Sequence, residues 1–178
     1  LGAEFDMKYG TWLRSLVFEY IYTKYQSGPY NHDRTQNIGD HIAGMDDYYN
    51  HSIYTGWQHW GQVIGNPLYR SPIYNTDNSI DVRNNRFYAV HLGVEGSPTE
   101  RLDYRVLTTY QKGWGTYNNP FTKAYKNFSF LVEAKYKFNH DWTVKGGYAM
   151  DFGSEKMYGH NAGFQLTVTK SGLLTKKK

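Results

Sequence analysis

The sequence lacks cysteine and has no long apolar run. Without cysteine, its 178 residues can form no disulfide, no thiolate–metal site and no thiol nucleophile. Mean hydropathy is −0.73, and no stretch is long and apolar enough for a transmembrane helix. These absences exclude a transmembrane helix and thiol catalysis within this sequence. They do not exclude a protein that crosses a membrane with strands.

The sequence also lacks a basic face. Its net charge is +4, but basic residues alternate with acidic ones inside the segments described below, and three lysines (Lys176, Lys177, Lys178) end the chain. A nucleic-acid-binding surface needs clustered basic residues interleaved with aromatic ones. We therefore expect no nucleic-acid partner.

Residues 126–138 carry the most informative pattern that is present. They read K-N-F-S-F-L-V-E-A-K-Y-K-F, so that Phe, Val, Ala and Tyr alternate with mostly polar residues. A period of two indicates a β-strand with one apolar and one polar face. A strand of this length with an aromatic apolar face is typical of one that crosses a bilayer, with its polar face towards a wet lumen.

The pattern recurs with the same polarity along the chain. Seven segments show it, at residues 3–9, 15–23, 88–95, 103–111, 126–138, 143–152 and 161–168. The connections alternate between short and longer, at residues 10–11, 26–84, 96–101, 112–125, 139–141 and 153–160. Outer-membrane barrels have short periplasmic turns and longer extracellular loops, and their aromatic side chains are concentrated at the membrane interfaces. Aromatic residues make up 18% of the chain, with 18 Tyr.

The sequence therefore predicts an all-β fold, an antiparallel transmembrane β-barrel. We expect about seven strands of a larger up-and-down barrel, with residues 1–178 forming the C-terminal portion of a single barrel domain. The odd strand count and the lack of a signal segment or a starting methionine indicate a longer protein. A soluble antiparallel sheet domain that binds carbohydrate is an alternative.

Charged residues on the polar faces are expected to face the lumen. The principal ones are Asp103, Arg105, Glu133 and Lys135. Their mixed signs favour ion pairs that brace the interior. In an open lumen, such charges would instead bias solute passage, as in a porin-like diffusion channel, which is a second alternative.

Residues 26–84 are predicted to form one long loop, either extracellular or folded into the lumen. The loop is crowded with rings and polar side chains, and long loops on rigid scaffolds often carry function. Tyr and Trp offer flat apolar faces to sugar rings, while Gln, His and Arg bond hydroxyl groups. The same rings would also serve to plug the lumen or cap the barrel rim. The carbohydrate-binding candidates are Tyr48, Tyr49, Tyr54, Trp57, Gln58, His59, Trp60 and Arg70.

Metal and catalytic signatures are weak in this loop. Its histidines (His32, His41, His51, His59) form no H-x-x-x-H pair, although oxygen ligands around Asp46 and Asp47 leave calcium open. Glycoside hydrolysis needs two facing carboxylates, and nothing selects a pair from Asp46, Asp47, Asp77 and Asp81. No G-x-S-x-G elbow is present. We expect no metal, no cofactor and no catalytic residues, and hence no enzyme.

Four runs resemble one known family. They are Y-Y-N-H-S-I-Y-T-G-W-Q-H-W-G-Q-V-I-G-N-P-L (residues 48–68), F-E-Y-I-Y-T-K-Y-Q-S-G-P (18–29), R-N-N-R-F-Y (83–88) and T-Y-Q-K-G-W-G-T-Y (109–117). With these runs the chain resembles the C-terminal part of the Wzi family of capsule-assembly outer-membrane proteins, in its Bacteroidetes-like form. The resemblance implies a large outer-membrane β-barrel that associates with capsular polysaccharide and helps attach it to the cell surface. The implied role is lectin-like and not catalytic.

Together these patterns predict a protein of the Gram-negative cell envelope. We expect a monomeric barrel in the bacterial outer membrane, with membrane lipid and capsular or surface polysaccharide as its partners. The binding residues named above come from side-chain chemistry, not from the resemblance.

Overall fold

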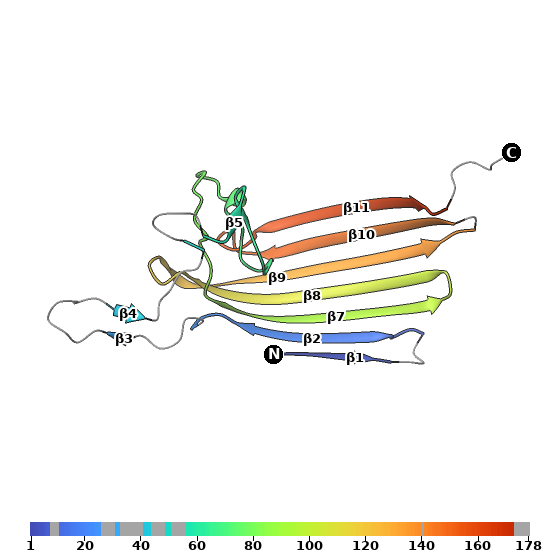
Figure 1. Ribbon diagram of the computed structural model, residues 1–178, viewed down its shortest axis with the longest axis horizontal. Coiled ribbons are helices and arrows are strands. Elements are labelled where there is room, and N and C mark those ends of the chain that lie inside the picture. The colour runs from blue at the N-terminus through green and yellow to red at the C-terminus, as the bar shows by residue number, and fades with distance from the viewer. Residues whose placement is uncertain are drawn as a thin grey trace. The chain divides into compact units, whose positions relative to one another are not determined.

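The main element of the fold is a seven-stranded sheet with the order β1-β2-β7-β8-β9-β10-β11 (Figure 1). The computed structural model describes residues 1–7, 11–25, 31–32, 41–43, 49–50, 56–139 and 141–172. The strands of this sheet are β1 (Gly2–Asp6), β2 (Ser15–Tyr22), β7 (Phe87–Thr99), β8 (Leu102–Gly115), β9 (Pro120–Lys137), β10 (Trp142–Gly153) and β11 (His160–Lys170). The prediction of an all-β fold is confirmed, and each alternating segment overlaps one of these strands. The first segment, predicted over residues 3–9, is a strand only as far as Asp6, and residues 8–9 lie outside the described residues.

Smaller elements lie between β2 and β7. They are β3 (Asn31–His32), β4 (His41–Ala43), β5 (Gln58–His59), β6 (Gln62–Val63) and the short 3₁₀ helix η1 (Pro72–Tyr74). The strands β3 and β4 form one two-stranded sheet, and β5 and β6 form another. The segment predicted as a long loop therefore holds local structure. The described part of the chain contains no helix long and apolar enough to cross a membrane.

The seven-stranded sheet is open in the part of the chain that the structure describes, with β1 and β11 at its two edges. The pairs β1–β2, β9–β10 and β10–β11 are antiparallel. About seven antiparallel strands were predicted, and seven strands form the main sheet. Closure into a barrel stays a prediction.

The register of β9, β10 and β11 brings their apolar side chains onto one face. Tyr148 of β10 lies opposite Val132 of β9 and opposite Phe164 of β11. Met150 similarly lies between Phe130 and Ala162. Because side chains alternate along a strand, this register collects the apolar residues on one side of the sheet and the charged ones on the other.

Part of that apolar face is exposed, while Phe130, Val132 and Met150 are half-buried. Phe128 and Tyr136 of β9 have 41% and 39% of their surface accessible, and Phe164 of β11 has 72%. A soluble sheet would bury such a face under a second layer of protein. These three side chains are exposed among the described residues.

Two predicted connections differ from the structure. The first, predicted as a short link at residues 10–11, instead separates Asp6 at the end of β1 from Ser15 at the start of β2. For the second, a medium-length link was expected over residues 112–125, but β8 continues to Gly115 and β9 starts at Pro120. Backbone pairing extends the strands through the glycine-rich run K-G-W-G, where Trp114 N donates to Arg86 O at 2.8 Å. The alternation of short and longer connections is correspondingly weaker than the sequence suggested.

The chain forms two compact units. Unit 1 comprises residues 1–20, 90–110 and 127–178, and unit 2 comprises residues 21–89 and 111–126. The buried apolar residues in the described part of unit 2 include Tyr69, Val82, Phe87 and Ala89, and Tyr49 packs against them. The aromatic rings among them are in contact, with centroids 5.0 Å apart for Tyr69 and Phe87 and 4.4 Å apart for Tyr49 and Tyr69. This aromatic cluster anchors the segment between β2 and β7 within unit 2.

Candidate functional site

The β5–β6 hairpin of unit 2 presents an exposed tryptophan at its tip. Trp60 and Gly61 connect the two strands, and both have positive φ, 51° and 71°. Positive φ at both central residues is the signature of a type I′ turn, which favours Asn-Gly. Tryptophan is a rare choice there because a bulky side chain is strained at positive φ. Trp60 is nevertheless 86% exposed, so burial of its ring does not compensate for that strain.

Hydrogen bonds hold this hairpin in place. Ile64 N donates to Trp57 O at 2.9 Å across its open end, and Ile73 N of η1 donates to Gly61 O at 2.9 Å. Val63 N donates to Ser71 Oγ at 3.1 Å. The turn that carries Trp60 is therefore tied to the segment around η1 and presents the ring from a fixed backbone.

Two other predicted binding residues accompany Trp60. The His59 ring lies edge-on to the Trp60 ring, with centroids 6.2 Å apart, and is exposed. Trp57 is 61% exposed at the start of the hairpin. Among the carbohydrate-binding candidates, these three offer accessible rings.

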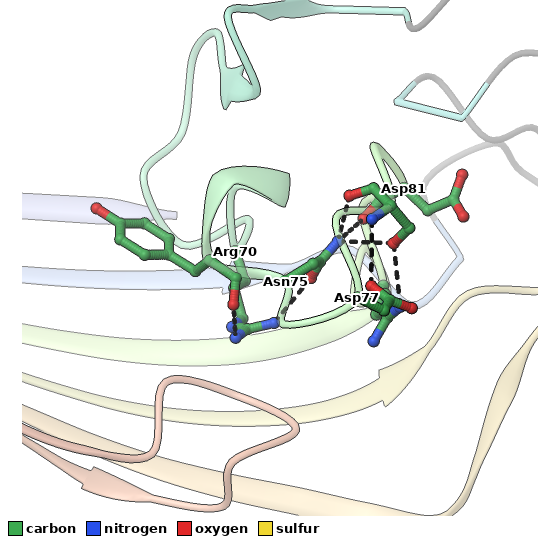
Figure 2. Close-up of polar contacts among 7 residues, drawn as sticks. Arg70, Asn75, Asp77 and Asp81 are labelled. Carbon is green, nitrogen blue, oxygen red and sulfur yellow. Dashed lines mark hydrogen bonds and ion pairs between the residues drawn. The ribbon is translucent and has the colours of Figure 1, made fainter.

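Three further candidates are engaged within unit 2. Tyr49 packs against Tyr69, and burial raises the pKa of its hydroxyl. Gln58 Nε2 donates to Tyr49 O and to Ile80 O, both at 3.0 Å. Arg70 donates to Asn75 Oδ1 at 2.9 Å and to Tyr74 O at 2.6 Å (Figure 2). Their described contacts are those of residues that hold the loop together. Tyr48 and Tyr54 lie outside the described residues.

Asn75 organises a polar network that the sequence did not single out (Figure 2). It is buried, and its Nδ2 donates to Ser79 O, Ser79 Oγ and Asp81 O at 2.9–3.1 Å. Arg83 contacts Ser79 Oγ at 3.0 Å and pairs with Asp77. The signal for this network was the run N-T-D-N-S-I-D at residues 75–81, whose Asn, Asp and Ser side chains are typical of tight turns.

Asp77 has the electrostatics of a structural carboxylate. Its pKa is lowered, first because Ser79 N donates to its carboxylate and then because Arg83 is hydrogen-bonded to it. A glycosidase general acid needs a raised pKa, so that it still carries its proton at neutral pH. The environment of Asp77 shifts the pKa in the opposite direction.

A polar cavity of ≈ 320 Å³ lies beside this network in unit 2. Its lining residues are Asn50, Asp81, Val82, Arg83, Thr116, Asn118 and Asn119. They come from three separate stretches of sequence, so no local sequence pattern predicts the cavity.

The predicted lumen charges form ion pairs in unit 1. Glu133 accepts from Arg105 Nε at 2.8 Å and from Lys145 Nζ at 2.6 Å. Asp103 pairs with Lys137 at 3.2 Å and with Lys135 at 3.6 Å. The expected bracing of opposite charges is therefore present. All of these groups except Lys137 line a cavity of ≈ 350 Å³. That these charged side chains face a lumen stays a prediction.

No three His, Asp or Glu residues converge as a metal site within the described ranges. His51, Asp46 and Asp47, on which a metal or calcium site would depend, lie outside them. His32 and His41 are placed in β3 and β4.

Comparison of the chain with protein-family models, with curated proteins and with solved structures yields no match. The resemblance to Wzi-type proteins therefore stays a prediction from the quoted runs.

Proposed function

We propose that this chain forms part of an outer-membrane β-barrel that binds capsular or other surface polysaccharide and holds it at the cell, without catalysis. The sheet supports the membrane component of this proposal. Part of its apolar, aromatic face is exposed, while the opposite face carries paired charges. A face of that kind suits hydrocarbon, and paired charges suit an enclosed, wetted interior.

The polysaccharide-binding part of the proposal rests on Trp60. Residues held in sparsely populated backbone conformations cost of order 1–3 kcal/mol and cluster at functional sites. Because the exposed ring of Trp60 does not offset that cost by packing, we interpret its conformation as serving binding. The exposed faces of Trp60, Trp57 and His59 suit the apolar faces of sugar rings. The hydrogen-bonded turn presents the indole ready-made, which reduces the entropy lost on binding.

The test replaces both exposed indoles in the full-length protein, as Trp57→Ala with Trp60→Ala, in the bacterium that produces it. We expect polysaccharide binding to weaken roughly tenfold or more, since truncating an aromatic anchor typically costs about 2 kcal/mol. Surface-retained polysaccharide is the readout. Insertion is checked from heat-modifiable migration of the protein in outer-membrane fractions.

Trp12→Ala is the matched control, because Trp12 is an exposed indole of unit 1, outside the hairpin. It should leave retention unchanged. Normal retention in a well-inserted double variant would overturn the proposal. So would normal retention in a deletion strain accompanied by solute flux through the reconstituted protein, which would identify a channel.

A further inference from the structure

We propose that the polar cavity of unit 2 is a subsite for one uncharged sugar unit of the polysaccharide, with Asp81 as the principal hydrogen-bond acceptor. This inference rests on the proposed function and adds to it a second contact region and a sugar chemistry. The residues of this subsite are distinct from the predicted binding residues.

The cavity has polar groups available to a ligand. The Asp81 carboxylate makes no hydrogen bond or ion pair with any described residue, since only its backbone carbonyl joins the Asn75 network (Figure 2). The side chains of Asn118 and Asn119 are exposed and likewise have no described partner. Among the described residues Arg83 forms hydrogen bonds through Nη2 alone, which leaves Nε and Nη1 as further donors. Together these groups provide acceptors and donors in one hollow.

The walls of the cavity are held rigidly. On one side, Asn50 brackets the backbone of Val82: its Oδ1 accepts from Val82 N and its Nδ2 donates to Val82 O, both at 2.7 Å. On the other side, Asn119 N donates to Thr116 Oγ1 at 2.9 Å, and Arg86 Nη1 donates to Thr116 O at 3.3 Å. A site whose backbone is already fixed loses little entropy when it binds a ligand.

Size and hydrogen-bonding capacity favour a sugar. A volume of ≈ 320 Å³ lies at the lower end of the range for small-molecule sites and is sufficient for one sugar ring. A carboxylate accepts hydrogen bonds from two hydroxyl groups at once, and amide side chains both donate and accept. Neighbouring hydroxyls of a pyranose present this combination.

Charge selects the kind of sugar. Arg83 is neutralised by its ion pair with Asp77, so the unpaired carboxylate of Asp81 leaves the cavity with net negative character. A uronate or a phosphorylated sugar would bring a second negative charge close to Asp81, at an energetic cost. An uncharged hexose or N-acetylhexosamine meets no such repulsion.

The test titrates the purified full-length protein with fluorescently labelled surface polysaccharide of the producing strain. Asp81→Asn keeps the size of the side chain but removes the charge, and we expect about tenfold weaker binding, as for the loss of a charge-assisted hydrogen bond. Uncharged hexoses and N-acetylhexosamines should displace the labelled polymer from the wild type at lower concentrations than glucuronate or galacturonate. In Asp81→Asn that preference should shrink.

Glu155→Gln is the matched control, because Glu155 is an exposed carboxylate in unit 1. It should bind as the wild type does. Unchanged binding by Asp81→Asn, together with lost binding by the Trp57/Trp60 double variant, would overturn the cavity proposal and leave the proposed function standing. Stronger displacement by uronates would overturn the sugar assignment. A wild type that binds no polysaccharide would overturn both.

Discussion

Gly96 is a residue whose identity is dictated by space. A Cβ placed on it would lie 2.0 Å from Trp12 O and 2.8 Å from the Tyr104 ring. The Tyr104 hydroxyl in turn donates to the same Trp12 oxygen. The link between β1 and β2 therefore passes directly against the backbone of β7, and no larger residue fits there.

Replacing Gly96 by Ala should destabilise the protein by about 2 kcal/mol, the usual cost of overpacking against backbone that cannot move. Chemical denaturation of the refolded protein measures this. Gly146→Ala is the control, because nothing lies within 4 Å of the Cβ it would add. Equal stability of the two variants would show that the approach of Trp12 is not a packing constraint.

Tyr69 makes unit 2 sensitive to alkali. Burial of its ring, together with the nearby Tyr49, raises the pKa of its hydroxyl from 10.0 to about 12, against a lowering by a hydrogen bond with Thr23. The unfolded chain would ionise first as pH rises. The stability contributed by neutral Tyr69 is therefore complete below pH 10 and is lost as pH rises from about 10 to about 12.

We expect up to roughly 2–3 kcal/mol of stability to disappear over that interval, two pKa units being about 2.7 kcal/mol. Hydrogen exchange of the unit 2 backbone as a function of pH reports it. Tyr69→Phe keeps the ring in the aromatic cluster and removes the ionising group, so its unit 2 should lose less stability over this range. The same loss in both proteins would assign the effect to another group.

At the scale of elements, the β5–β6 hairpin combines strain with exposure. Its turn requires positive φ at Trp60 and Gly61. Asn tolerates that conformation better than Trp does, and Asn-Gly is the preferred pair for this turn. At position 60, therefore, the residue that would best stabilise the turn is Asn, whereas the residue present is a Trp that exposes its indole.

Trp60→Asn should stabilise the hairpin by several tenths to about 1 kcal/mol while it weakens polysaccharide binding. Hydrogen exchange of the hairpin amides and the binding titration measure the two effects. Gly61→Ala is the contrasting variant: it should destabilise the hairpin, because its φ is 71° and the added Cβ would sit 3.4 Å from Ile73 N. If Trp60→Asn weakened both stability and binding, the indole would have a structural role.

At the scale of the whole molecule, the two faces of the main sheet differ in what they tolerate. Leu166 and Gln165 are neighbours in β11 and point to opposite faces. Leu166 lies on the apolar face, in register with Gly146 of β10, while Gln165 pairs with Gly147. If the apolar face contacts lipid, only one of these two positions accepts a charge.

Leu166→Arg should therefore reduce insertion into the outer membrane, with a cost of about 2–4 kcal/mol near the bilayer centre, whereas Gln165→Arg should insert normally. The fraction of each variant in outer-membrane preparations is the measurement. Equal insertion of both variants would indicate that the apolar face does not contact hydrocarbon.

The strands were predictable from the sequence because alternation is a local property. Each strand of the main sheet repeats apolar and polar residues with a period of two, and that period also determines which residues share a face. Strand ends were less predictable. The runs at residues 112–115 and 120–125 lack the alternation, although they belong to β8 and β9. At the end of β8 the backbone of Trp114 and Gly115 pairs with that of Arg86.

The roles of the loop residues depended on tertiary contacts. The sequence identified Trp57, His59 and Trp60 by their chemistry, and in the structure all three are exposed. It identified Gln58 and Arg70 on the same grounds, yet both are hydrogen-bonded to loop backbone. Residue type does not distinguish a side chain that faces solvent from one that donates to a backbone carbonyl of the loop.

The amino-acid sequence by itself determined the two-faced strands, since hydrophobic alternation and strand geometry share one period. Tertiary structure decided the cavity, which joins Asn50, residues 81–83 and residues 116–119. Those stretches meet only because the aromatic cluster and the backbone pairing of unit 2 bring distant parts of the chain together. Such contacts depend on the packing of the whole unit, and they leave no periodic mark in any one segment.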